Sequence, residues 1–449
     1  MSKNSRISGF YKLQRGERLD ALRDFCNLPV DQTQILTRDG SLNFDIADLF
    51  VENAVGSYPL PMGIATSFKI NNHDYLVPMA VEESSVVAAT SNAAKIIYES
   101  GGFKTEVISQ MMIGQIQILD LPISKFSEVT EKIYKHKNEL LKVANEIHPR
   151  LLMRGGGARD LEVRTFSEAE IPFLVVHLLM DTKDAMGANL INTACERLAP
   201  LFEELSGARI GLKILSNLAD RRVVKATCCV EKERLSFRDP SLHWNPSEMT
   251  ARIHEAFIFA DNDPYRATTH NKGIMNGIDP VVIATGNDWR AVEAGAHAYA
   301  ARTGRYRSLS RWTLNDNNDL IGELEIPLQL GTVGGVTRLH PMARVSLQIL
   351  ENPNAAQLSQ IVACSGLAAN LAAMRALCTT GIQRGHMKLH AKNLALAAGA
   401  NRNEVEIIAK EMLQGKNISA GKAEELLREL RDKSQKEANV GVLSSSSPS

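Results

Sequence analysis

The chain has 449 residues, 44% of them hydrophobic, and this length and composition predict two or three domains with large buried cores. Lysine plus arginine and aspartate plus glutamate number 51 each, so the net charge of zero excludes an overall basic field that would recruit nucleic acid or an anionic membrane. The six cysteines form no CxxC pair, which indicates reduced, structural thiols in a cytosolic protein.

The most apolar segments of the chain do not predict a membrane protein. The N-terminal residues lack the apolar stretch of a signal peptide. The longest uncharged run, residues 355–374, is interrupted by Asn, Gln and Ser, so it predicts a pair of buried helices and not a membrane span. We therefore expect a soluble, cytoplasmic protein with no membrane partner.

The predicted elements begin with amphipathic helices in residues 1–50. Two alternating strands follow within residues 64–81, joined by a turn at Asn71-Asn72. A helix is predicted from Glu82 to about Tyr98, and Gly101-Gly102 closes it.

Residues 105–231 alternate strands and helices in the manner of one compact α+β unit. The predicted strands are 105–121, 171–181, 209–216 and 221–231, and the predicted helices are 124–146 and 187–205. The later part of the chain is richer in helix. Its predicted elements are helices 247–260 and 288–301, strands 280–285, 308–314 and 320–328, and helical segments 341–380 and 402–434.

Two isolated charges stand in stretches of small residues that resemble turns. Lys272 lies within His-Asn-Lys-Gly-Ile-Met-Asn-Gly (residues 270–277), and Asp288 ends Ala-Thr-Gly-Asn-Asp (residues 284–288). Glycine and asparagine neighbours let a backbone wrap closely around a bound group, where a lysine could stabilise an oxyanion. Asp288 is predicted either to cap helix 288–301, which the pattern by itself favours, or to orient the lysine and keep it charged.

Residues 181–189, Asp-Thr-Lys-Asp-Ala-Met-Gly-Ala-Asn, follow an apolar strand and open a helix. N–H groups at such a helix N-terminus can hold a pyrophosphate, and Gly187 and Ala188 would let it approach closely. The pattern by itself is explained better by an ordinary helix start with Asp184 as its cap. The chain has neither GxGxxG nor GxxxxGK[ST], so neither of the two common nucleotide motifs is predicted.

Two further patterns have a structural and a functional interpretation. Glu82 and Glu83 precede a helix, and favourable charge–dipole placement explains them better, by the pattern alone, than a buried glutamate acting as a proton donor. His386 and His390 have a spacing that can bind zinc, but no HExxH glutamate or third ligand accompanies them, so no metal is predicted. Following Gly381 and Gly385, His386 could instead be a general acid on a mobile element.

Seven short motifs rich in charged and small residues occur along the chain in this order: Glu52-Asn-Ala-Val-Gly56, Val81-Glu-Glu-Ser-Ser85, Asp184-Ala-Met-Gly-Ala-Asn189, Asp263-Pro-Tyr-Arg266, His270-Asn-Lys-Gly-Ile-Met-Asn-Gly277, Thr285-Gly-Asn-Asp288 and Gly381-Ile-Gln-Arg-Gly-His386. Together they resemble the soluble bacterial and archaeal (class II) 3-hydroxy-3-methylglutaryl-CoA (HMG-CoA) reductases. The resemblance covers about residues 5–430. Each motif alone is weak, whereas seven in order make chance a poor explanation.

The resemblance implies site residues that the patterns above leave open. The implied catalytic quartet is Glu83, Lys272, Asp288 and His386. The implied contacts to the hydroxymethylglutaryl group are Arg266, Ser85 and Asn276. The implied dinucleotide site, of a non-Rossmann type, contains Asp184, Ala185, Met186, Gly187, Ala188 and Asn189, together with His148 and Asn217.

The implied fold class is α+β. A large mixed helical and sheet substrate domain, residues 1–108 and 221–380, would contain an inserted small ferredoxin-like cofactor domain, residues 109–220. Residues 381–449 would form a C-terminal helical flap that ends in a disordered-looking tail. Because the family's sites form between subunits, we expect a homodimer or a higher homo-oligomer.

The implied reaction interconverts HMG-CoA and mevalonate plus CoA by two successive hydride transfers, through mevaldyl-CoA and mevaldehyde. Lys272 would stabilise the oxyanion formed by the first hydride, and Asp288 would keep the lysine charged. His386 would protonate the departing CoA thiolate, and Glu83 would donate a proton in the second reduction. Because two cofactor molecules are consumed, the flap must open between them.

A position shortly before the triple glycine of residues 155–157 bears on the choice of cofactor. Members of the family that prefer NAD carry an acidic residue there, which bonds the ribose 2′-hydroxyl, whereas His148 stands at this position here. A carboxylate would repel a 2′-phosphate and a histidine would not, and Arg150 and Arg154 are close in sequence. We therefore expect NADPH, with NADH as the alternative, and a biosynthetic role towards isoprenoids in the mevalonate pathway.

Three other functions remain open at this stage. The same reaction could run in the catabolic direction with NAD. A CoA-thioester acyltransferase would use Cys364 or Cys378 with His386. A non-catalytic dimer would bind CoA or a nucleotide without turnover, and loss of Glu83 would then be silent.

Overall fold

The structure is a computed structural model that describes residues 3–38, 42–235, 245–379 and 382–444, without the side chains of residues 382–386, 388–389 and 434–444. The chain forms two compact units. The first comprises Met1–Glu82 and Val86–Ala372, and the second comprises Glu83–Ser85 and Ala373–Ser449. Each is described by itself.

The first unit contains a six-stranded sheet with the strand order β2-β1-β3-β8-β10-β9. The pairing of β1 with β3 is parallel and short, and the other neighbours are antiparallel. The predicted turn at Asn71-Asn72 is confirmed, since both residues have positive φ and join the first two strands. The strands are β1 (Met62–Ile70), β2 (His73–Ala80), β3 (Phe103–Val107), β8 (Val223–Val230), β9 (Ser310–Leu314) and β10 (Leu320–Pro327).

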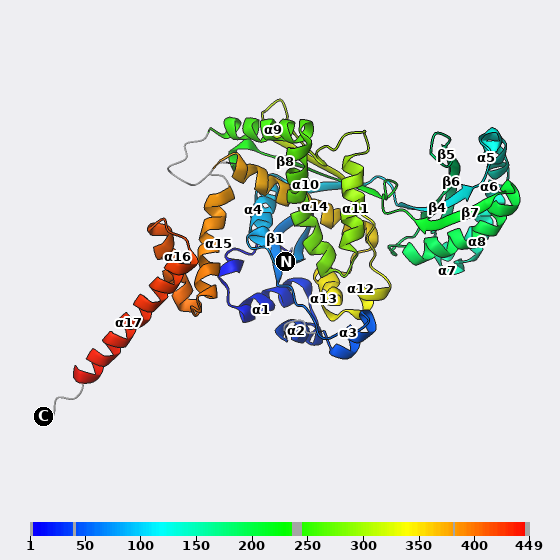
Figure 1. The fold of residues 1–449 in the computed structure, drawn as a ribbon. Coiled ribbons are helices and arrows are strands. Elements are labelled where there is room, and N and C mark those ends of the chain that lie inside the picture. Colours follow the sequence, from blue (N-terminus) through cyan, green and yellow to red (C-terminus); the bar gives the residue numbers. More distant parts are fainter. Residues whose placement is uncertain (1–2, 39–41, 236–244, 380–381, 445–449) are drawn as a thin grey trace. The chain divides into compact units, whose positions relative to one another are not determined.

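The first unit also contains a four-stranded antiparallel sheet with the order β5-β6-β4-β7 (Figure 1). Along the chain its main elements follow the β-α-β-β-α-β order of ferredoxin-like folds. The strands are β4 (Met111–Leu119), β5 (Gly157–Phe166), β6 (Phe173–Asp181) and β7 (Arg209–Leu215), and the helices are α5 (Phe126–Lys135), α6 (Lys137–Glu146), α7 (Pro149–Met153) and α8 (Ala188–Ser206).

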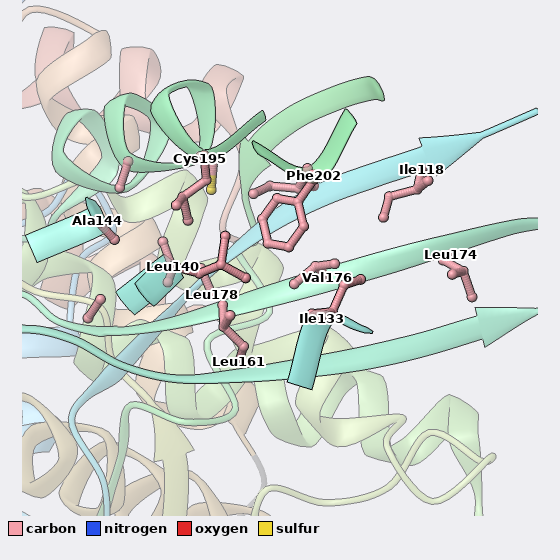
Figure 2. Packing of buried hydrophobic residues seen from close by; sticks show 14 of the residues in the cluster. Ile118, Ile133, Leu140, Ala144, Leu161, Leu174, Val176, Leu178, Cys195 and Phe202 are labelled. Atoms are coloured by element: carbon pink, nitrogen blue, oxygen red, sulfur yellow. The ribbon is translucent and has the colours of Figure 1, made fainter. Parts of the chain in front are cut away.

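Helices α5, α6 and α8 bury their apolar faces against one face of this sheet (Figure 2). On β6 every second residue points into this core, among them Leu174, Val176 and Leu178, as the two-residue period of a strand requires. On α8, Cys195 and Phe202 are fully buried two turns apart on the inner face. The apolar faces of the strands and of the helices thus pack against each other in one core.

The other helices of the first unit pack around the six-stranded sheet and against one another (Figure 1). Short 3₁₀ turns occupy Phe10–Lys12, Ile123–Lys125 and Lys232–Leu235. The helices are α1 (Arg15–Cys26), α2 (Val30–Thr37), α3 (Phe44–Phe50), α4 (Val86–Glu99), α9 (Pro246–Asn262), α10 (Pro264–Ala284), α11 (Trp289–Ala300), α12 (Gly335–Leu339), α13 (Pro341–Ile349) and α14 (Ala355–Leu377), the last of which extends into the second unit.

The turn-like stretch at 270–277 and the strand at 280–285 are wrong predictions, because residues 270–284 lie inside the single helix α10 and Thr285 is its C-cap. The glycines there serve helix packing. A Cβ atom on Gly277 would collide with the backbone carbonyl oxygen of Ser365 on α14, so α10 and α14 touch through their backbones. Small residues in a sequence thus have two meanings, a turn or a close helix crossing.

Four other predictions were wrong. The predicted strand 105–121 is two strands, β3 and β4, which belong to different sheets. Because β3 pairs with β8, residues 105–231 do not form one unit. The predicted helix 124–146 is divided into α5 and α6, whereas the predicted helix pair within 355–374 is the single helix α14.

Helix α14 is the one described helix that is long and apolar enough to cross a membrane. Two-thirds (67%) of its most apolar window is buried inside the protein. Its Ser365 and Asn370 side chains are also buried, and Asn370 accepts two hydrogen bonds from β9. These are the properties of a core helix.

The second unit consists mainly of α15 (Ile382–Ala397), α16 (Arg402–Gln414) and α17 (Ala420–Ser444). The three helices pack on one another around their own core, in which Ile408, Met412 and Leu427 are buried. The helical prediction for 402–434 is confirmed, with a break between α16 and α17. Gly381 and the tail beyond Ser444 lie outside the described residues. The α+β fold class is confirmed.

Candidate active site

Helix α10 carries three of the predicted site residues. Asp263 caps it by accepting a hydrogen bond from the Tyr265 N–H (3.1 Å), and half-buried Arg266 lies in its first turn. Lys272 is exposed, and half-buried Asn276 follows it by one turn, so the two share a face of the helix. The structure thereby brings Lys272 and Asn276 together.

A buried polar network holds α10 in place. The Nε2 atom of His270 lies 2.7 Å from the Ser310 hydroxyl, which donates to Oδ1 of Asn370 (2.8 Å). The indole N–H of Trp312 donates to the same oxygen (2.7 Å). Burial, with a smaller contribution from Arg266, lowers the pKa of His270 to about 3, so this imidazole is neutral at physiological pH. The network ties the lysine-bearing helix to β9 and α14.

Asp288 caps helix α11, as the pattern favoured. Its Oδ1 atom accepts a hydrogen bond from the Ala291 N–H (3.1 Å), and Arg290 lies 3.7 Å from the same oxygen. The side chain is exposed at 44%, which leaves it accessible to a ligand. Its predicted second role, orienting Lys272, stays a prediction.

Two residues that the sequence analysis missed connect the start of α11 to neighbouring loops. Asn287 accepts a hydrogen bond from the Gly331 N–H (2.7 Å). The Gln329 amide donates to the Ala291 carbonyl (2.6 Å) and to the Asn217 carbonyl (3.2 Å). Asn217 itself is exposed. The position of Asn287 beside the aspartate in Thr-Gly-Asn-Asp was the only sequence signal for this connection.

The predicted dinucleotide stretch forms a tight turn before α8. The Ala185 N–H donates to the Thr182 carbonyl (3.1 Å), and Gly187, at φ 104°, is the N-cap of the helix. A Cβ atom at this position would collide with the Thr182 side chain. Glycine is therefore required both by the positive φ and by this close contact. Ala188 is half-buried and Asn189 is exposed at the helix start.

Asp184 does not cap α8, so the predicted ordinary helix start is wrong in this detail. Its carboxylate instead accepts a hydrogen bond from the Ala355 N–H (3.0 Å) at the start of α14. The residue that occupies the N-cap of α8, Gly187, has no side chain with which to cap it. The N–H groups of this helix end therefore carry no N-cap side chain, which suits an anion ligand.

His148 lies beside the same helix. Its Nε2 atom is 3.2 Å from the Leu190 carbonyl oxygen, so Nε2 carries the proton that it donates. Arg150 and Arg154, which follow His148 on and after α7, are exposed. A histidine therefore contacts the first turn of α8, and two exposed arginines follow it in the chain.

The remaining predicted residues belong to the second unit. Helix α4 begins at Val86, four residues later than predicted, so Glu83 lies in the turn that precedes it and is half-buried. Ser85 in the same turn has φ 75°, a backbone conformation that non-glycine residues adopt rarely. His386 lies on α15, but its side chain is outside the described residues.

The acyltransferase alternative has little support at Cys364, one of its two candidate nucleophiles. All six thiols are free. Burial raises the pKa of Cys364 well above its ordinary value, so this residue holds its proton and is a poor nucleophile. Within the described residues, no three His, Cys, Asp or Glu side chains gather closely enough to hold a metal ion.

These features define an α+β protein in which a small antiparallel sheet is accompanied by a helix that starts without an N-cap side chain. Comparison with known proteins makes the class specific. Residues 14–391 match the family model described as hydroxymethylglutaryl-coenzyme A reductase. The chain belongs to the HMG-CoA reductase family.

Relatives and solved structures agree with this assignment. The HMG-CoA reductase of Archaeoglobus fulgidus is 45% identical over 428 residues, which cover 95% of each chain. A solved HMG-CoA reductase from Streptococcus pneumoniae has a TM-score of 0.80 and 44% identity, and the match covers 94% of this chain and 99% of that one. A second Streptococcus pneumoniae structure, a class II enzyme bound to NADPH in open conformations, has a TM-score of 0.79 and 43% identity, covering 83% and 99%.

Proposed function

We propose that the protein reduces HMG-CoA to mevalonate and CoA, in two hydride transfers that consume two NADPH molecules. The observation that carries the proposal is the family match, which spans the helix bearing Lys272, the capping Asp288 and the turn before α8. The similar Streptococcus pneumoniae enzyme was solved with NADPH bound. The nicotinamide supplies the hydride, and the residues of this chain bind, orient and transfer protons.

NADPH is preferred over NADH in this proposal because of the charges near α8. The 2′-phosphate of NADPH carries negative charge, which a carboxylate would repel. His148 stands at the discriminating position, and the exposed cations of Arg150 and Arg154 follow it. The turn from Asp184 to Asn189, with Asn217, would hold the remainder of the dinucleotide.

The roles within the quartet follow from charge. Lys272, a cation on a helix that the buried network of His270 holds in place, would stabilise the oxyanion of the first reduction. Asp288 would keep that lysine charged. Glu83 would be the proton donor of the second reduction, and His386 would protonate the CoA thiolate. Arg266, Ser85 and Asn276 would contact the hydroxymethylglutaryl group.

The domain roles are assigned on the same basis. Residues 109–220 contain the whole four-stranded sheet and would form the cofactor domain. Residues 1–108 and 221–380 would bind substrate, and residues 381–449 would be the flap. Six free cysteines suit a cytoplasmic location. The subunits would assemble as homodimers or larger homo-oligomers, with active sites shared between chains.

The biosynthetic direction is proposed because it follows from NADPH. The alternative, mevalonate oxidation with NAD, requires a cofactor preference opposite to the one that the charges near His148 favour. A non-catalytic nucleotide-binding dimer is disfavoured by the family match.

The test is a spectrophotometric assay of NADPH oxidation with HMG-CoA, with free CoA measured as the second product. The wild-type protein should oxidise two NADPH for each CoA released. Lys272→Ala should retain its fold, because the side chain is exposed, and should lose turnover by about 10²-fold or more. Full turnover by the variant would remove the lysine from the mechanism, and no turnover by the wild type would reject the function. A higher kcat/KM with NADH than with NADPH would reverse the cofactor assignment and favour the catabolic direction.

A further inference from the structure

Arg222, immediately before β8, is a buried arginine whose partners lie mainly in the turn that precedes α8. Its guanidinium makes five hydrogen bonds, four of them to main-chain carbonyl oxygens. Nη1 donates to the Thr182 hydroxyl (2.8 Å) and to the carbonyls of Ala185 (3.0 Å) and Met186 (3.3 Å), and Nη2 donates to the carbonyls of Lys183 (3.2 Å) and Leu330 (2.6 Å).

Burying such a cation is costly unless its donors are used. Burial lowers the pKa of Arg222 to about 10, against the opposing influence of Asp181 and Asp184, so the group remains charged at neutral pH. Asp181 is itself engaged, since its carboxylate pairs with the Lys183 ammonium (2.8 Å). The charge of Arg222 is therefore matched by carbonyl dipoles of the turn, which a planar fork of donors can hold together.

The turn is also in close contact with the segment that follows β10. The Asp184 carbonyl accepts a hydrogen bond from the Thr332 N–H (2.8 Å). A Cβ atom on Gly331 would lie 2.6 Å from the Met186 nitrogen, so only glycine allows this approach. Arg222 bonds both sides of this contact, because the Leu330 carbonyl is one of its acceptors.

We propose that Arg222 is a positioning residue for the dinucleotide. It draws the carbonyls of the turn inward, and this keeps their partial negative charges away from the phosphates and presents the N–H groups at the start of α8 outward. The buried cation also adds positive potential behind the phosphate-binding turn. The inference rests on the proposed function, since it concerns the cofactor site assigned there.

The test compares Arg222→Lys and Arg222→Met with the wild type, with Arg221→Met as a matched control. Arg221 is the adjacent arginine, but its side chain is exposed at 49% and pairs with Glu162 at 3.2 Å. A lysine ammonium concentrates its donors on one nitrogen atom, so it cannot replace the planar, forked donors of the guanidinium. Both Arg222 variants should raise the KM and the Kd for NADPH by about tenfold or more, while the KM for HMG-CoA changes by less than about twofold.

A second variant guards against loss of folding. Thr182→Val preserves the side-chain shape and removes the hydroxyl that accepts from Nη1 and donates to the Ala185 carbonyl (2.8 Å), so it should raise the Kd for NADPH by about threefold or more. If the Arg222 variants do not fold, Thr182→Val decides the question. A lysine variant with partial recovery relative to methionine would support an electrostatic contribution to positioning.

The failures of the two proposals are distinguishable. A wild-type protein that does not bind NADPH, measured by nicotinamide fluorescence, rejects the proposed function. A wild-type protein that binds NADPH, together with folded Arg222→Lys or Thr182→Val variants of unchanged NADPH affinity, overturns the inference about Arg222 alone. An equal loss of affinity for NADPH and HMG-CoA would also overturn it, because a merely structural role predicts that result.

Discussion

Asp279 on α10 and Glu293 on α11 are two carboxyl groups whose protonation states influence each other. Burial, reinforced by Glu293, raises the pKa of Asp279 to about 9. The hydrogen bond from His297, whose Nε2 lies 2.6 Å away, lowers the pKa of Glu293. Asp279 is therefore the protonated partner at neutral pH and Glu293 the ionised one.

This pair predicts a dependence of stability on pH. The folded-state pKa of Asp279 is above its ordinary value of 3.8, so between about pH 4 and pH 9 the folded state holds a proton that the unfolded state lacks. The stabilisation is complete at the acid end and is lost as the pH rises through about 9. Asp279→Asn should remove this slope, and urea unfolding at several pH values measures it.

The control for this experiment is Asp316→Asn, at an exposed position in the β9–β10 turn. Its unfolding free energy should follow the wild-type curve. Parallel curves for wild type and Asp279→Asn would show that Asp279 is ionised in the folded state, contrary to the burial argument.

At the scale of elements, the crossing of α10 and α14 decides where Lys272 lies. Each helix contributes a glycine to the crossing: Gly277 faces the Ser365 carbonyl, and a Cβ atom on Gly366 would lie 2.8 Å from the Ile278 side chain. The helices are thus held closer than side chains would allow. The glycines that resembled a turn in the sequence are the reason that this packing is possible.

Gly277→Ala tests the crossing. Alanine is better than glycine in a helix by about 1 kcal/mol, but overpacking against a backbone carbonyl costs about 1–3 kcal/mol or more. We expect a net loss of about 1 kcal/mol or more in unfolding free energy, seen as a lower Tm and denaturant midpoint. Gly16→Ala on α1 is the control, because its Cβ would meet no atom of the described chain within 4 Å. A variant at position 277 that is as stable as this control would contradict the packing argument.

At the scale of the whole molecule, the segment from α3 to β1 exposes large apolar side chains. Leu49, Val55 and Tyr58 are 85%, 99% and 89% exposed, and Val55 belongs to the Glu52–Gly56 motif. Apolar groups clustered on an exposed segment commonly mark an interaction surface. They support the proposed assembly with a second copy of this chain.

The proposed dimer predicts a molar mass of twice the 49.3 kDa of one chain in light scattering coupled to size-exclusion chromatography. Val55→Asp should shift the protein towards the single-chain mass and reduce turnover, because a charge placed in a dimer interface must be desolvated. Lys12→Asp is the control, a charge change at an exposed residue outside this segment. A wild-type protein of single-chain mass with full activity would reject the shared active site.

The elements that were predicted correctly have a local cause. The Asn71-Asn72 hairpin, helix α8 and the cap at Asp288 follow from turn chemistry, helical period and capping preference, which act over a few neighbouring residues. The family was recognisable from seven motifs that occur in order, although each motif alone is weak. The roles of Lys272, Glu83 and His386 remain predictions from that resemblance.

Other features depend on residues that are far apart in the chain. No periodic pattern in the sequence indicates the pairing of β3 with β8, the hydrogen bond from the Ala355 N–H to Asp184, or the contacts of Arg222 with the turn before α8. Asp184 and Ala355 are separated by 171 positions, and a carboxylate beside a helix start looks the same whichever helix it caps. The sequence by itself determined many of the local elements and the family. Only the tertiary structure decided which glycines form turns, which glycines allow close helix packing, and which side chains hold the turn before α8. These features depend on contacts that form only when distant segments of the chain meet.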